Sequence, residues 1–408
     1  MRDPLTRIAL ILGLLSAIGP FAIDMYLPAL PQVARDLETT EKGAAMTLGA
    51  YFIAFGIGQM IWGPLADACG RKGPLAWGVV LFLLASIAAW AAPSIHALVA
   101  ARAVQGLGAA TLMAVPRAIL RDIATGPRAQ RLMATIMVVT AVSPMLAPLT
   151  GSAVLTRGGW REIFAILAGT SLVSLALIAL ALPETLAPPD RRPIRVAGMA
   201  RDARHLLGDR RFVGLTLVGG FGMASFFVYL AAASFVFTGQ YGLGPTGFSL
   251  AFAANAVGFF SASQFAAGLA RRWGTERVIA AAVTAFLAVT AGLASLVLAG
   301  FDALWLLLAG LVLANAAMGI VAPTTMVLSL DPHPRMAGLA SSLGGTIQML
   351  TGAGMIALAA PFMDNTARSM TPAIAACALL AWVSAVVALP RPGWLARGAA
   401  AEGRAGTR

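Results

Sequence analysis

Two charged side chains stand where apolar residues surround them, and both are candidates for proton chemistry. Asp24 is the only one of the 17 acidic residues that we place well inside an apolar span, and Arg102 lies inside another. Loss of hydration disfavours the charged form of an isolated carboxylate, so we expect Asp24 to bind and release a proton. A buried guanidinium usually faces a cavity or an acid. The alternatives are a helix-end cap at Asp24 and an Arg102 side chain that reaches toward water.

A second cluster of charge lies in the segment Gly63-Pro-Leu-Ala-Asp-Ala-Cys-Gly-Arg-Lys72. Gly63 and Gly70 allow close helix approach and a tight turn. Asp67 can face a helix N-terminus and pair with an arginine such as Arg71. Such contacts can hold one conformation and break in another, so we predict a conformational latch here. The alternative is a solvated turn.

The sequence gives little support to an enzyme or a metal site. Its two cysteines and three histidines show no metal-ligand spacing, and no HExxH, CxxC or nucleophile-elbow pattern occurs. We therefore expect no catalytic residue, no metal and no cofactor.

The elements that must position these residues are apolar helices. The chain of 408 residues is 59% hydrophobic and 11% charged, whereas a soluble domain carries about 25% charged residues. Roughly 20 apolar residues cross a 30 Å hydrocarbon core as a helix. We count twelve such spans, at residues 8–30, 44–66, 74–92, 97–119, 131–154, 163–183, 212–238, 246–270, 278–300, 303–329, 336–360 and 371–389. The predicted class is an all-α membrane protein within a lipid bilayer.

The distribution of basic residues supports this count and an orientation. With both termini in the cytoplasm, 23 of the 29 Lys and Arg residues fall in cytoplasmic segments and five in outside loops. Such an excess is the positive-inside pattern, so the net charge of +12 does not require nucleic acid. In this orientation, at about 1.5 Å of rise per residue, Asp24 and Arg102 reach similar levels in the outer half of the membrane. Their contact requires that the two helices be neighbours.

The segment Pro183–Arg211 divides the spans into two sets of six, and it carries four prolines and seven arginines. A short echo of residues 63–70 at 267–274 suggests a repeat. Two homologous six-helix bundles with substrate bound between them form a known transporter plan. We predict a bundle at 1–183, a cytoplasmic linker at 184–211, and a second bundle with a short cytoplasmic tail at 212–408.

Two motifs resemble those of the major facilitator superfamily. Residues 63–72 resemble its signature G-x-L-a-D-r-x-G-r-k, with Ala68 where the family often has Arg. Residues 102–110 resemble its R-x-x-q-G-x-g-a-a motif, which implies packing roles for Gln105 and Gly106. The resemblance implies two pseudo-symmetric six-helix bundles around a central cavity, the major facilitator fold. Asp67 is then expected near the N-terminal end of span eleven, around 336–338, while the cytoplasmic side is closed.

A more specific resemblance is to the bicyclomycin- and chloramphenicol-resistance subgroup of twelve-helix drug:proton antiporters. It rests on the run DMYLPALP at 24–31 and on the segments 117–122, 159–164 and 182–186. We therefore include Arg117 in the predicted latch.

Residues 143–152 look like the antiporter motif of the same family. Pro148 and Gly151 match it, while other small residues replace some of its glycines. Together with Pro144, these residues allow kinks and close helix packing.

Aromatic and amide side chains within the spans are candidates to line a cavity for amphiphilic ligands. We select Tyr26, Tyr51, Tyr229 and Asn255. The alternative is that each serves helix packing and hydrogen bonding alone.

The resemblance implies a proton-coupled multidrug or small-molecule efflux antiporter that works by alternating access in a bacterial inner membrane. Its expected partners are a small amphiphilic substrate, protons and lipid, without nucleic acid, and we expect a monomer. One alternative is an exporter of a specific endogenous metabolite. Another is a polytopic receptor or sensor, although no sizeable soluble signalling domain is present.

Overall fold

The computed structural model describes residues 4–124, 126–191, 193, 196–333 and 336–389, and every regular element in those ranges is helical. The α-helices are α1 (Pro4–Asp24), α2 (Leu30–Asp36), α3 (Glu41–Cys69), α4 (Lys72–Trp90), α5 (Ile95–Ile123), α6 (Gly126–Leu155), α7 (Trp160–Ala181), α8 (Val196–Gly208), α9 (Arg210–Phe235), α10 (Pro245–Trp273), α11 (Thr275–Leu298), α12 (Leu304–Leu330), α13 (Ala337–Ala359) and α14 (Ala367–Ala388). Shorter turns are η1 (Leu27–Ala29), η2 (Pro188–Asp190), the π-helical η3 (Val236–Gln240) and η5 (Ala360–Phe362).

Twelve stretches of the described chain are long and apolar enough to cross a membrane, as predicted. They contain 19 to 32 residues, whereas roughly 20 suffice for a hydrocarbon core. Three of them join α-helices to short turns: α1, η1 and α2; α9 and η3; and α13 and η5. The predicted all-α membrane fold with twelve spans is confirmed.

The first span is broken immediately after Asp24. α1 ends there, and η1 precedes α2. Pro28 and Pro31 lack a backbone N–H, and each stands at the start of its element, where that donor is not needed. The sequence therefore favours two short elements over one continuous helix at this point. The break places the Asp24 carboxylate at a helix end inside the protein.

Polar caps determine where two of the site-bearing helices begin. The side chain of Thr40 accepts a hydrogen bond from the Gly43 N–H at the start of α3, and Ser94 does the same for the Ala97 N–H at the start of α5. Such caps satisfy N–H groups that have no partner within the helix. They anchor the registers of α3 and α5, which carry most of the site described below.

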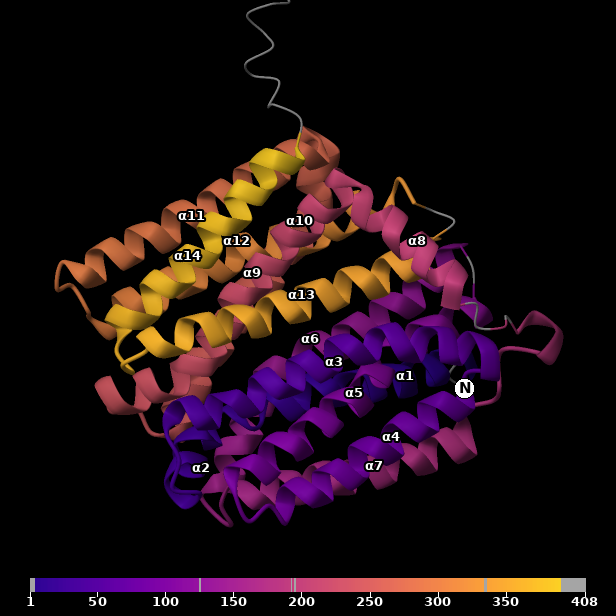
Figure 1. The fold of residues 1–408 in the computed structure, drawn as a ribbon, viewed down its shortest axis with the longest axis horizontal. Helices are drawn as coiled ribbons and strands as arrows, with labels where there is room; N and C mark the ends of the chain where they lie inside the picture. The colour runs from indigo at the N-terminus through magenta and orange to yellow at the C-terminus, as the bar shows by residue number, and fades with distance from the viewer. Residues whose placement is uncertain (1–3, 125, 192, 194–195, 334–335, 390–408) are drawn as a thin grey trace, which may run out of the picture.

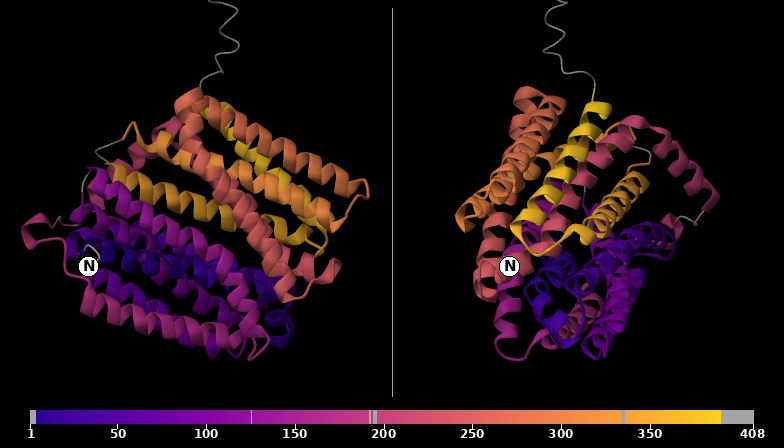
Figure 2. Two further views of the ribbon diagram at one scale, coloured as in Figure 1. Left: turned by 180° about the vertical axis from the view of Figure 1, so that it is seen from behind. Right: turned by 60° about the vertical axis from the view of Figure 1, so that its left-hand side comes forward.

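The helices gather into two halves (Figure 1). The indigo to magenta helices α1 to α7 form one half, and the pink to yellow helices α9 to α14 form the other, a division that further views also show (Figure 2). The main contacts between them are α3 with α13 and α6 with α10. We call this boundary the seam. Following the predicted orientation, we call the end where α3 begins the outer end and the end where it finishes the inner end.

The segment that we predicted as a linker contains the helix α8. It packs against α9 and α13, and its Leu206 is fully buried in a cluster with Phe212, Ala340 and Leu343. The apolar residues of α8 alternate with charged ones, so no long apolar run marked this helix in the sequence. The domain boundaries at 183 and 212 stay a prediction.

Candidate functional site

Asp24 is buried at the seam, with 5% of its surface exposed. Among the described residues, no ion pair or hydrogen bond of its carboxylate is recorded. The side chains of Tyr51 and Tyr229 lie within electrostatic range of its carboxylate. Tyr51 belongs to α3 and Tyr229 to α9, so both halves of the molecule contribute to the surroundings of this acid.

Arg102 is fully buried on α5 among aromatic rings and polar groups. Its guanidinium lies over the ring of Tyr51, 4.4 Å from the centroid, and over that of Tyr26 at 4.9 Å. It also donates a hydrogen bond to Gln105, whose amide in turn donates to the Ser86 hydroxyl at 2.7 Å. Cation–π contacts and the amide partly replace the hydration that the guanidinium loses on burial.

Asp24 and Arg102 come from adjacent helices but do not form an ion pair in this structure. Arg102 instead donates to the backbone oxygen of Ala22, two residues before Asp24, at 3.4 Å. Its Nε and Nη2 groups have no hydrogen-bond partner among the described atoms. Unpaired buried donors are costly, so these two groups can bind an acceptor that approaches in another conformation.

Hydrogen bonds orient the two tyrosines around Arg102. The Tyr51 hydroxyl donates to the Gly19 oxygen at 3.1 Å, and the Tyr26 hydroxyl accepts from Thr47 at the same distance. A Cβ at Gly106 would clash with the Tyr51 backbone oxygen, so the glycine lets α3 and α5 approach closely. The small residue thereby brings the tyrosine to the arginine.

A chain of polar groups continues from Tyr229 within the second half. Asn255 of α10 donates to the Tyr229 hydroxyl at 3.4 Å and accepts from Asn315 of α12 at 3.0 Å. Tyr229 and Asn255 are almost fully buried. Asn315 was not among our predicted site residues, because the sequence does not show that α10 and α12 bring it to Asn255.

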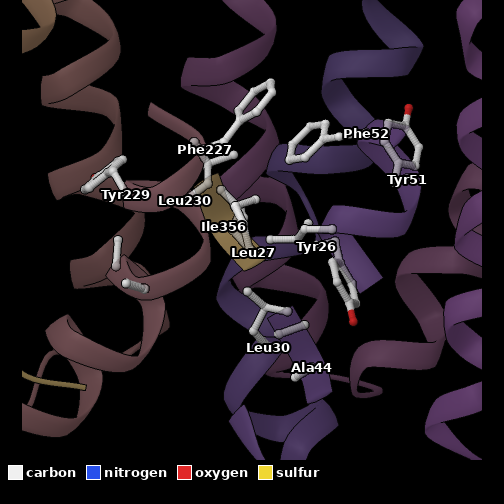
Figure 3. Close-up of a cluster of buried hydrophobic side chains, with 14 of the residues drawn as sticks. Tyr26, Leu27, Leu30, Ala44, Tyr51, Phe52, Phe227, Tyr229, Leu230 and Ile356 are labelled. Carbon is white, nitrogen blue, oxygen red and sulfur yellow. The ribbon is translucent and has the colours of Figure 1, made fainter. Parts of the chain in front are cut away.

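Aromatic and aliphatic side chains from both halves form one buried cluster at the seam, and Tyr26 and Leu27 of the broken first span belong to it (Figure 3). Phe52 of α3 stacks on Phe227 of α9, with ring centroids 3.8 Å apart. Leu27 and Leu30 from the broken first span join the same buried cluster, as does Ile356 of α13. Apolar contact between the halves therefore fills the seam around these residues.

A pair of serines joins α6 to α10 in the same region. The hydroxyls of Ser152 and Ser249 lie 2.6 Å apart, and Ser249 also donates to the Pro148 oxygen at 2.8 Å. A Cβ at Gly151 would clash with the Met25 backbone oxygen. The antiporter-like segment thus contacts both the broken first span and the opposite half, and α6, with Pro144 and Pro148 inside it, remains one helix.

The packing of α3 on α13 extends toward the inner end. Thr346 donates to the Gly56 oxygen at 2.7 Å, and a Cβ at Gly63 would come within 3.6 Å of the Ser342 hydroxyl. Gly63 therefore lies at an interface between the two halves, where a Cβ would make an ordinary van der Waals contact, and its role in a latch stays a prediction.

Arg71 forms the centre of a charge cluster at the inner end. Its guanidinium binds Asp67 and Asp122, with the Nε to Asp122 Oδ2 distance at 2.8 Å. Burial opposes the charge, but the hydrogen bonds to Asp122 and Asp67 outweigh it and raise the pKa of Arg71 above its usual value. Asp122 is a member of this cluster that we had quoted only as part of a resemblance.

Glu184, which follows α7, caps the start of α4 from a distance of more than 100 residues along the chain. Its carboxylate accepts from the backbone N–H groups of Arg71 at 2.8 Å and Lys72 at 3.1 Å. Burial opposes ionisation, but these and two local backbone hydrogen bonds hold the pKa of Glu184 below its ordinary value. Gly70 adopts a φ of +92°, which favours glycine and turns the chain toward this carboxylate.

The other two charged latch residues differ in their contacts. Asp67 is half exposed and pairs with Arg71, and no hydrogen bond to residues 336–338 is recorded. Arg117 on α5 is exposed, and within the described ranges it forms no ion pair. The side chain of Arg71 binds two acids of the first half, Asp67 and Asp122, and the expected position of Asp67 near span eleven stays a prediction.

The part of the chain that the structure describes holds no group of three or more His, Cys, Asp or Glu side chains suited to a metal ion. The arrangement is chemically simple: one buried acid without a basic partner, one buried cation with free donors, and tyrosines and amides between the halves. It can bind a proton and a partly polar, partly apolar molecule. Such a site between two halves of a twelve-span bundle is typical of an integral membrane transport protein.

A family model of the Major Facilitator Superfamily matches residues 12–356. The chain therefore belongs to this superfamily, whose members are transporters and not enzymes.

Curated relatives support the narrower resemblance. The chain is 35% identical over 350 residues to the uncharacterized MFS-type transporter YdgK of Bacillus subtilis (strain 168), covering 85% of this chain and 86% of that protein. It is 29% identical to a bicyclomycin resistance protein homolog of Haemophilus influenzae, covering 91% and 93%. It is 31% identical to a chloramphenicol resistance protein of Pseudomonas aeruginosa, covering 85% and 80%. The predicted resemblance to this subgroup is confirmed.

Solved structures agree on the fold. The crystal structure of a D-xylose-proton symporter matches with a TM-score of 0.75 and 16% identity, covering 95% of this chain and 98% of that one. At this identity the likeness concerns the fold alone, and it confirms the predicted major facilitator fold.

Proposed function

We propose that this transporter is a proton-coupled antiporter that exports small amphiphilic, drug-like molecules by alternating access. The observation that carries the proposal is Asp24, a buried acid on the seam for which the described residues supply no basic partner. A carboxylate in such a place can exchange a proton with whichever side the seam opens to. The names of two relatives refer to drug resistance, which supports export and a drug-like substrate.

Arg102 is the second group in the proposed coupling. While Asp24 is protonated, the guanidinium needs no acid partner and is held by Gln105, Ala22 and the tyrosine rings. When Asp24 loses its proton, its charge attracts the two free donor groups of Arg102. Formation and loss of this pair would link the proton to the position of α1 relative to α5.

The proposed substrate site lies between the halves, at Tyr26, Tyr51, Tyr229 and Asn255. Aromatic faces bind the apolar part of an amphiphile, while phenol hydroxyls and an amide orient its polar part. Because Tyr229 and Asn255 belong to the second half, a bound substrate touches both halves and responds to their relative movement. Substrate and proton would then compete for binding near Asp24. Such competition is what an antiporter needs in order to exchange one for the other.

The proposed latch, Gly63, Asp67, Gly70, Arg71 and Arg117, acts at the inner end. The charge cluster fixes the inner end of α3, and α3 packs on α13 through the glycine face at Gly56 and Gly63. A fixed α3 end favours closure of the inner seam, and loosening the cluster favours opening.

We further propose that the protein lies in a bacterial inner membrane as a monomer with both termini in the cytoplasm. The charge pattern of the loops supports the orientation. A proton taken up from the outside would then bind Asp24, and substrate would leave outward.

Transport by purified protein in liposomes tests this function. Radiolabelled chloramphenicol is offered outside vesicles with an acidic interior, so that outward proton movement drives uptake. We expect uptake that a protonophore abolishes, together with proton release when the drug is added. Uptake that is the same with and without a pH gradient would contradict proton antiport.

A further inference from the structure

A crevice separate from the Asp24 site opens at the outer end of the seam, where α3 meets α9 and α13. Its empty space is about 400 Å³ when its open mouth is counted. Ala45, Val228, Phe235, Ile356 and Met363 contribute apolar walls from both halves. A crevice of this shape accepts a small group and the first part of an apolar chain, rather than a whole large molecule.

One wall of the crevice carries a carboxylate oxygen that lacks a partner. Glu41 lines the crevice, and its Oε2 is sealed from water without a hydrogen bond from any described residue. Glu41 is also the first residue of α3, where an acid suits the helix dipole. The dipole explains an acid at this position but not a buried oxygen without a donor, which is costly.

The neighbouring basic residue does not supply that donor. Lys42 also lines the crevice, but its ammonium donates to the Pro361 oxygen at 3.4 Å, across the seam. No ion pair between Glu41 and Lys42 is recorded in the described part of the chain. A negative group therefore faces apolar walls, which is the complement of an ammonium group on an apolar body.

We propose that this crevice binds the ammonium group of an amphiphile, with the Glu41 carboxylate as its negative partner. With 29 residues, α3 is about 43 Å long, which exceeds the hydrocarbon core of about 30 Å. Glu41, at the start of this helix, therefore lies near the membrane surface, where amphiphiles hold their polar groups. The ligand is either an amine-bearing lipid or a soluble organic cation. Because both halves form the walls, an occupied crevice holds the outer end closed. We call this end the outer end because of the orientation proposed above. The binding site itself does not depend on that orientation.

A labelling experiment tests the site without any transport. A Met363→Cys variant places a thiol in the crevice, while the exposed Cys69 at the inner end serves as an internal control and Cys377 is buried. In nanodiscs of phosphatidylglycerol alone, we expect hexyltrimethylammonium to slow maleimide labelling at position 363 but not at Cys69. Hexyl sulfate, with the same chain and opposite charge, should not protect.

Charge variants then assign the effect to Glu41. Adding Glu41→Gln should raise the half-protecting concentration of hexyltrimethylammonium at least about tenfold, because the amide removes the negative charge that attracts the cation in a partly buried site. Glu41→Asp should restore most of the protection, which excludes simple misfolding. Glu38→Gln, at an exposed acid three residues earlier, should change nothing.

Nanodiscs of phosphatidylethanolamine distinguish the two sources of the ammonium group. Protection there without added cation, lost in Glu41→Gln, would support the proposal with a lipid as the ligand. Protection only by the added cation would support it with a soluble ligand. Protection by neither, or equal protection in Glu41→Gln, would overturn the proposal while leaving the transport function untouched.

Discussion

The rings of Phe52 and Phe227 lie face to face across the seam, with centroids 3.8 Å apart and planes inclined by 6°. Phe52 belongs to α3 in one half and Phe227 to α9 in the other. The pair lies in the buried cluster that both halves share at the seam. Opening the outer end requires this stack to separate, so the pair contributes directly to the equilibrium between conformations.

Phe227→Ala should shift the population toward the outward-open form. An aromatic pair contributes about 0.5–1.5 kcal/mol beyond its buried area, which corresponds to a roughly 2- to 13-fold change in the conformer ratio. Spin-label distances between the outer ends of α3 and α9 would measure the shift. Phe226→Ala is a matched control, because Phe226 contacts aromatic rings of its own half. Identical distances in Phe227→Ala and the wild type would contradict the role of the stack.

Asp67→Ala should loosen the inner end of α3 and favour the inward-open form. Asp67 is half exposed, so its pair with Arg71 contributes about 0.5–1 kcal/mol, or a roughly 2- to 5-fold change in conformer ratio. Spin labels at the inner ends of α3 and α13 would report longer distances. If transport is lost while these distances are unchanged, Asp67 does not act through the latch.

Asp122→Asn should reduce stability more than Asp67→Asn does. Asp122 binds the largely buried Arg71 at 2.8 Å, and its loss leaves a buried guanidinium with a weaker partner. A buried group that loses its hydrogen-bond partner typically costs about 1–3 kcal/mol. Thermal unfolding of the purified variants, followed by intrinsic fluorescence, gives the order directly. A larger loss for Asp67→Asn would mean that the exposed acid is the main partner of Arg71.

The cap formed by Glu184 should make stability depend on pH in one direction. Because the pKa of Glu184 is lower in the folded protein than in the unfolded chain, its contribution is present above the unfolded value of about 4.3 and is lost as pH falls through the folded value. Near neutral pH, Glu184→Gln should thus lower the free energy of unfolding by about 0.5–1 kcal/mol, the loss expected for an exposed cap. The variant should unfold at a lower temperature than the wild type. The difference should shrink below about pH 4. A difference that grows on acidification would contradict the cap.

The sequence predicted the helices and the identity of the buried acid because both depend on composition along the chain. An acid within a long apolar run must be buried somewhere, and the positions of Asp24 and Arg102 along their helices gave their level. The level of a residue in the membrane does not determine which way its helix is rotated about its axis or which rotamer the side chain adopts. For that reason the pairing of Arg102 with Gln105 and Ala22, instead of Asp24, could not be predicted.

Contacts between distant segments were also beyond prediction. Glu184 and Arg71 are 113 residues apart, and only the packed bundle brings them together. The stack of Phe52 on Phe227 depends on which faces of α3 and α9 meet, and no pattern in a uniformly apolar helix specifies that face. The buried Glu41 oxygen without a hydrogen-bond partner likewise could not be predicted, because it results from how the ends of three helices from both halves pack around it.

The proton-driven transport of Asp24→Asn in liposomes tests the central proposal most directly. The amide keeps the shape of the side chain and cannot carry the proton. We expect the variant to bind chloramphenicol but to show no uptake driven by an acidic interior, while Glu38→Gln, at an exposed acid, transports like the wild type. Uptake by Asp24→Asn at the wild-type rate and with the same dependence on the pH gradient would show that Asp24 is not the proton carrier.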